Sequence, residues 1–156
     1  MPVGALRFAP AQLTVGVRLL MQLPDVRALP EAVSASRLEP LFVCTLTAAA
    51  AEADKVSVLL ELSDKQWHTY ELVSSVLAKD LSAFLKNAWQ PDDLPRTEAL
   101  LSIIGHLGLT DAMSFLMEKA QSSASSASVR SAILEASKEF GAAPFDPYLG
   151  MPAHRR

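Results

Sequence analysis

The chain has 156 residues, of which 50% are apolar and 20% charged, and its formal net charge is −3. This composition excludes wholesale disorder, and the slight acidic excess argues against a nucleic-acid-binding domain, which would normally be basic on one face. The single cysteine, Cys44, excludes an intrachain disulfide framework and a multi-cysteine metal site. The length suits one domain with its own hydrophobic core.

The residue usage predicts an all-α protein. Ala and Leu are abundant, and both lose little side-chain entropy in a helix. Residues 56–62 begin with β-branched side chains, but a lone strand would have no partner, so we interpret them as helical or as a buried connector. We expect an irregular bundle of about six to seven helices over residues 1–141, and an extended proline-containing tail over residues 142–156.

Several helix boundaries are predicted in the first third of the chain. A first helix is expected from residue 10 to residue 23, with apolar side chains around most of its circumference. Pro30 is expected to open a second helix, and Pro40 to break it after Leu38. Helix then resumes at residue 41 and continues through an alanine block to Asp54.

The N-terminal region gives evidence about the cellular compartment of the protein. It carries Arg7 and Arg18 but no acidic residue before Asp25, a pattern that resembles mitochondrial transit peptides. The alternative is a core helix that happens to lack acids. No secretory signal and no apolar run long enough for a transmembrane span is present. We therefore expect an intracellular protein, cytoplasmic unless the N-terminus is a mitochondrial signal.

The longest periodic segment lies between residues 63 and 89. Ser63 and Gln66 fit a capping box, which predicts that a helix begins there. One face of that helix would be apolar, comprising Trp67, Tyr70, Val73, Leu77, Leu81, Phe84, Leu85 and Ala88. A second, smaller stripe lies on the opposite side, comprising Leu72, Val76 and Ala83. This second stripe is either enclosed by the bundle or is a docking face for a partner.

Turn-forming residues divide the C-terminal half. Residues 91–95, PDDLP, predict a break, and Thr97 is expected to cap a helix that Gly108 ends. Thr110 is expected to cap the next helix. The serine-rich residues 122–128 are either a flexible joint or a weak helical continuation.

The end of the chain combines prolines with apolar side chains. Gly141 is placed to cap the last helix. The tail beyond it suits docking into a groove, because prolines hold the backbone extended at low entropic cost. The alternative is a disordered tail. Its apolar residues are Phe145, Tyr148, Leu149 and Met151.

No recognisable catalytic constellation occurs in the sequence. His68, His106 and His154 lack acidic or cysteine neighbours at metal-ligand spacing, so each is interpreted as a surface residue. Cys44 lies in an apolar run and is expected in the core. Phosphate-binding glycine loops and nucleophile elbows are missing too. We expect no catalytic residues, no metal and no cofactor.

The leading hypothesis is therefore a non-enzymatic interaction protein, an adaptor or small subunit in a larger assembly. Its mean hydropathy of +0.22 is high for a chain without a membrane span, which indicates apolar surface reserved for protein contacts. We expect one or more protein partners in a hetero-complex and no nucleic acid. The candidate interface is Leu72, Val76, Ala83, Phe145, Tyr148, Leu149 and Met151. The alternative is a helical carrier or peripheral-membrane protein, with Met113 and Met117 lining an apolar site.

Overall fold

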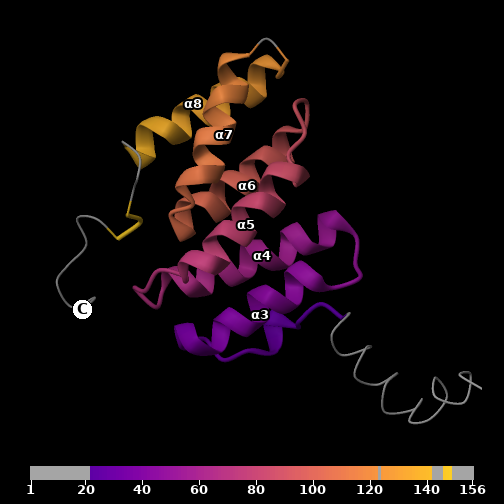
Figure 1. Cartoon of the computed structure of the whole chain (residues 1–156), viewed down its shortest axis with the longest axis vertical. Helices are drawn as coiled ribbons and strands as arrows, with labels where there is room; N and C mark the ends of the chain where they lie inside the picture. The colour runs from indigo at the N-terminus through magenta and orange to yellow at the C-terminus, as the bar shows by residue number, and fades with distance from the viewer. Residues whose placement is uncertain (1–21, 123, 142–145, 149–156) are drawn as a thin grey trace, which may run out of the picture.

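The computed structural model describes residues 22–122, 124–141 and 146–148 (Figure 1). These residues form no strand, which confirms the all-α prediction. The helices among them are the 3₁₀ turn η1 (Val26–Ala28), α3 (Ala35–Thr47), α4 (Glu52–Trp67), α5 (Ser75–Ala88), α6 (Leu94–Leu107), α7 (Thr110–Gln121) and α8 (Ala127–Phe140). Most of the first expected helix, residues 10–21, and the tail residues Phe145, Leu149 and Met151 lie outside the described part.

The helices alternate between two layers. In one layer α5 contacts both α3 and α7, and in the other α6 contacts both α4 and α8. Figure 1 shows the successive helices stacked from α3 at one end to α7 and α8 at the other. The described residues thus form a bundle of six α-helices, as the sequence predicts.

Helix α6 lies at the centre of the packed residues. Its side chains Leu100, Ile103 and Ile104 are all 0% exposed, because α4, α7 and α8 contact it from several sides. Leu59 of α4 and Ile133 of α8 are likewise fully buried. In the part of the chain that the structure describes, no helix is both long enough and apolar enough to cross a membrane.

Pro40 does not end a helix, contrary to the sequence prediction, and lies inside α3. Its ring is on an exposed side of the helix, while Leu38 and Phe42 on either side of it are 0% exposed. A proline in a helix interior costs about 3 kcal/mol. Burial of these two large side chains in one core offsets that cost and keeps the helix continuous.

The alanine block does not continue the helix either. α3 ends at Thr47, and the backbone at Ala48 is extended, with ψ of 146°. Lys55 Nζ donates at 3.0 Å to Leu46 O, one of the carbonyl groups that have no helical amide donor at this end, and the Thr47 hydroxyl donates at 3.0 Å to Val43 O in the preceding turn. The prediction of helix through residues 48–51 is wrong because these contacts stabilise a helix end there.

The segment from 63 to 89 is two helices rather than one. α4 runs to Trp67 and includes residues 56–62, which are therefore helical. Residues 68–74, here called the α4–α5 turn, separate it from α5. The capping box prediction is wrong, because Ser63 and Gln66 lie in the last turns of α4. The residue that caps α5 is Ser74, whose hydroxyl accepts from the Leu77 amide at 3.2 Å.

A break precedes α6 as predicted, but Leu94 and Pro95 already belong to the helix, and the cap of α6 differs from the prediction. Asp93 is the N-cap, and its Oδ1 accepts from the Arg96 amide at 3.0 Å. Thr97 lies inside the helix and is buried, where its hydroxyl donates to Asp93 O at 2.8 Å and accepts from Trp89 Nε1 at 3.1 Å. Gly108 ends α6 in the left-handed conformation, as predicted, with φ of 68°.

The last two helices follow the predictions in part. Thr110 is the first residue of α7 and not its cap, which is Leu109. In the serine-rich segment, Ser126 caps α8 by accepting from the Val129 amide at 3.3 Å, so residues 127–128 are helical. Gly141 ends α8 as predicted, with φ of 81°.

Candidate functional site

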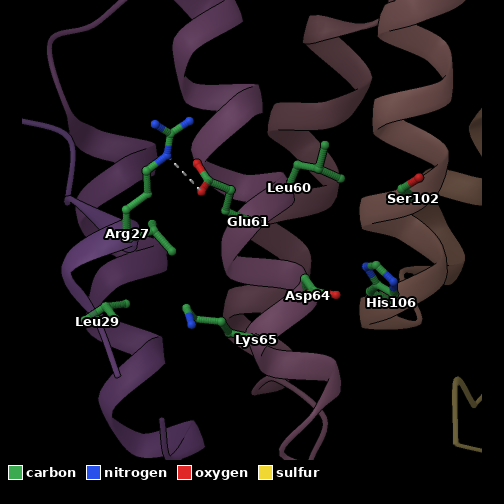
Figure 2. Close-up of a pocket in the computed structure, with 9 residues that line it drawn as sticks. Arg27, Leu29, Leu60, Glu61, Asp64, Lys65, Ser102 and His106 are labelled. Atoms are coloured by element: carbon green, nitrogen blue, oxygen red, sulfur yellow. Dashed lines mark ion pairs between the residues drawn. The ribbon is translucent and has the colours of Figure 1, made fainter. Parts of the chain in front are cut away.

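A pocket of about 500 Å³ lies where η1, α4 and α6 meet (Figure 2). Two cations and two carboxylates share its wall with apolar side chains, so its lining is mixed and not purely apolar. Its lining residues are Val26, Arg27, Leu29, Leu60, Glu61, Asp64, Lys65, Ser102 and His106.

Most charges in this pocket already have partners. Arg27 Nε lies 3.9 Å from Glu61 Oε2, and Lys65 Nζ donates to Pro30 O at 3.1 Å. The Arg27 side chain is 89% exposed, so its ion pair contributes little to stability. These contacts attach the N-terminal segment to α4, and we assign them a structural role.

His106 is the least expected member of the pocket. It is half-buried, which makes the surface prediction wrong for this histidine, and its Nδ1 lies 3.3 Å from Ser63 Oγ. The Ser63 hydroxyl has a single proton, which it donates to Leu60 O at 2.8 Å. Ser63 Oγ must then accept from His106 Nδ1–H. This arrangement leaves His106 Nε2 unprotonated and able to accept a hydrogen bond.

Burial lowers the pKa of His106 below its usual 6.5. The Asp64 carboxylate opposes this effect by raising the pKa, and His68 adds to it. The imidazole is therefore neutral near pH 7 and packs against the Trp67 ring, with centroids 5.9 Å apart. No group of three or more His, Cys, Asp or Glu side chains within residues 22–122, 124–141 and 146–148 is placed to hold a metal ion.

The lowered pKa predicts how stability depends on pH. Because the folded chain binds the His106 proton more weakly than the unfolded chain, stability is lost as the pH falls below about 6.5. We expect this acid-side loss to be smaller in His106→Asn than in the wild type. Urea unfolding at intervals from pH 7.5 to pH 5 measures it, and equal losses in the two proteins would contradict the expectation.

Tyr148 lies on the other side of the end of α4. It is 2% exposed, and its hydroxyl lies 3.1 Å from Gln66 O and 3.2 Å from Glu71 O. Its ring packs against Tyr70, with centroids 5.7 Å apart. Burial raises the pKa of Tyr148 to about 12, so the phenol stays a neutral donor. Tyr148 is one of the predicted interface residues, but in the structure it packs against its own chain.

The predicted second stripe is on the surface, though not as one helical face. Val76 in the first turn of α5 is 70% exposed, and Leu72 in the α4–α5 turn is 56% exposed. Ala83 is also exposed, two turns further along α5. The other exposed large apolar side chains among the described residues are Val43 and Leu134.

The remaining candidates have ordinary positions. His68 is exposed, as predicted, and His154 lies outside the described residues. Cys44 is half-buried and not in the core, and its thiol donates to Gln22 O at 3.5 Å. Gln22, at the start of the described residues, lies against this side of α3.

Two interactions at this end of α4 were not predicted from the sequence. They join His106 to Ser63 and Tyr148 to Gln66, which are separated by 43 and 82 positions. No short motif marks such pairs. The only local signal of these interactions is that a serine and a glutamine, Ser63 and Gln66, are buried on an otherwise apolar face of α4.

Comparisons with protein-family models, with curated protein sequences and with solved structures found no match to this chain.

Proposed function

We propose that this chain is a non-enzymatic adaptor or small subunit that binds a protein partner through the Leu72–Val76 surface, defined as Leu72, Val76 and Ala83. The supporting observation is the exposure of Leu72 and Val76, at 56% and 70% the two most exposed large apolar side chains in the described part. Burying one such side chain contributes about 1.5–3 kcal/mol, so leaving both in water has a cost that a partner would remove.

The surroundings of these side chains suit a protein interface. Lys79 and Asp80 lie one turn further along α5 from Val76, and both are exposed, as is Glu71 beside Leu72. An apolar centre with a charged rim is the usual anatomy of a protein interface.

The alternative of an apolar-ligand carrier has less support. A small-molecule site is normally 300–1,000 Å³ and mainly apolar. The pocket beside His106 has that size, but Arg27, Glu61, Asp64 and Lys65 line it. The space bounded by Leu85, Leu100 and Leu116 is apolar, but it has no room for even a water-sized molecule.

The test is affinity capture from native extract with mass spectrometry, using wild type and Val76→Asp. Because Val76 is exposed, we expect the variant to keep the wild-type circular dichroism spectrum and melting temperature. We expect it to lose captured partner at least tenfold, because the new carboxylate would have to be desolvated in the complex.

Leu134→Asp is the matched control, because Leu134 is an exposed apolar residue on α8, away from the proposed surface. It should capture the partner as the wild type does. A folded Val76→Asp protein that still captures every wild-type partner would contradict the proposal. Liposome flotation of the wild-type chain would favour the peripheral-membrane alternative instead.

A further inference from the structure

Tyr148 is the largest fully buried side chain in the described part of the chain, although it lies outside every helix. A residue in a tail that made no contact with the helices would be exposed to solvent. Its burial therefore indicates a site on the helices that accepts a tyrosine. That site is the α4–α5 turn with the end of α4.

The hydroxyl of Tyr148 joins the end of α4 to the middle of this turn. It shares its single proton between Gln66 O, in the last turn of α4, and Glu71 O, the middle residue of the α4–α5 turn. The buried Gln66 side chain reinforces the second carbonyl, since its Nε2 donates to Glu71 O at 2.7 Å. Thr69 Oγ1 donates to Gln66 O at 2.6 Å. Each of the two carbonyls therefore accepts one hydrogen bond from a neighbouring side chain and one from Tyr148.

The turn needs such support because its backbone is strained. Tyr70 has φ of 60°, and a non-glycine residue in the left-handed region costs about 1–2 kcal/mol. The Tyr148 ring packs against Tyr70 in this conformation. Loss of Tyr148 would remove a ring contact and a shared hydrogen bond from the part of the chain that holds Leu72.

The segment that carries Tyr148 has a shape suited to insertion. Asp146 Oδ1 accepts from the Tyr148 amide at 2.8 Å, which makes a local turn, and Pro147 between them restricts the backbone. A restricted segment loses less entropy when it binds.

We propose that Asp146–Tyr148 is an intramolecular latch: a tyrosine peptide that binds the α4–α5 turn and holds it in the conformation that presents Leu72 and Val76. This inference rests on the proposed function, because it concerns control of the same surface. By linkage, the partner and the latch stabilise each other, and release of the latch lowers partner affinity. The chemical group recognised is a tyrosine side chain. Its hydroxyl donates to the two backbone carbonyls, and its ring packs against the ring of Tyr70.

The first experiment measures the latch without a partner. Amide hydrogen exchange of the full chain is compared among wild type, Tyr148→Phe and Tyr148→Ala. We expect the amides of residues 69–72 to exchange about tenfold faster in Tyr148→Ala, with a smaller increase in Tyr148→Phe, which keeps the ring. The amides of α6 should be unchanged, which shows that the variants are folded. Unchanged exchange in the turn would overturn the proposal.

A peptide supplies a test in trans. A synthetic peptide of residues 142–152 should restore slow exchange in the turn of Tyr148→Ala, and the same peptide with phenylalanine at the tyrosine position should restore less. The peptide should have little effect on the wild type, whose site is occupied. Equal effects of the two peptides would overturn the assignment of the hydroxyl as the recognised group.

Partner capture then tests control of the surface. We expect Tyr148→Ala to capture about tenfold less of the partner that is sensitive to Val76→Asp. If Tyr148→Ala exchanges faster in the turn but captures that partner as the wild type does, the proposal that the latch controls the surface is overturned. If Val76→Asp itself leaves capture unchanged, the proposed function fails, and the exchange and peptide results alone decide whether the latch exists.

Discussion

Replacing Leu81 by alanine is expected to lower the free energy of unfolding by about 2–5 kcal/mol. Leu81 is 0% exposed on α5, the middle helix of its layer, which contacts α3 on one side and α7 on the other. Truncation would leave a cavity that neither neighbouring helix can fill without moving. With a total stability of roughly 5–15 kcal/mol for a domain of this size, the loss should be evident in urea unfolding.

Val76→Ala is the matched control for this change. It removes apolar atoms from the same helix at a position that is 70% exposed, so we expect an effect within about 0.5 kcal/mol. A comparable loss in the two variants would mean that α5 does not pack through its Leu81 side.

Phe42→Ala is expected to lower the free energy of unfolding by about 3–5 kcal/mol. Phe42 is 0% exposed and lies two residues after Pro40 in α3. Its burial, with that of Leu38, is the interaction that we hold responsible for a helix that continues through a proline. We therefore expect the variant to lose helix content in α3 as well as stability. Thermal melts and circular dichroism measure both effects.

The adjacent residue provides the control. Val43 is 47% exposed, so Val43→Ala should change stability by much less than Phe42→Ala and should leave α3 intact. A Phe42→Ala protein with the stability and helix content of Val43→Ala would contradict our account of Pro40.

The Leu72–Val76 surface could be predicted from the sequence only in part. The sequence placed Leu72 and Val76 together on one stripe of a continuous helix, and both are indeed apolar positions that face away from the core. The assumed helix is interrupted, however, and Leu72 lies in the α4–α5 turn. Their exposure could not be predicted, because hydrophobic periodicity does not tell an enclosed stripe from a solvated one.

The sequence by itself determined the helical class and those boundaries that depend on local chemistry. Ala and Leu favour helix through their own side-chain entropy, and Gly108 and Gly141 end helices because glycine adopts positive φ without a steric cost. The break before α6, at residues 89–93, has the same local origin. In each case the physical cause lies within a few residues of the effect.

Only the tertiary structure decided the helix through Pro40, the end of α3 at Thr47 and the burial of Tyr148. The helix through Pro40 depends on the common core around Phe42, and the burial of Tyr148 depends on Gln66 O and Glu71 O, which are both distant in the chain. The end of α3 depends on the Lys55 ammonium in the next helix. Local propensities differ by about 1 kcal/mol or less for most residues, whereas burial of one large side chain contributes more. Where the two oppose each other, packing between distant residues determines the structure.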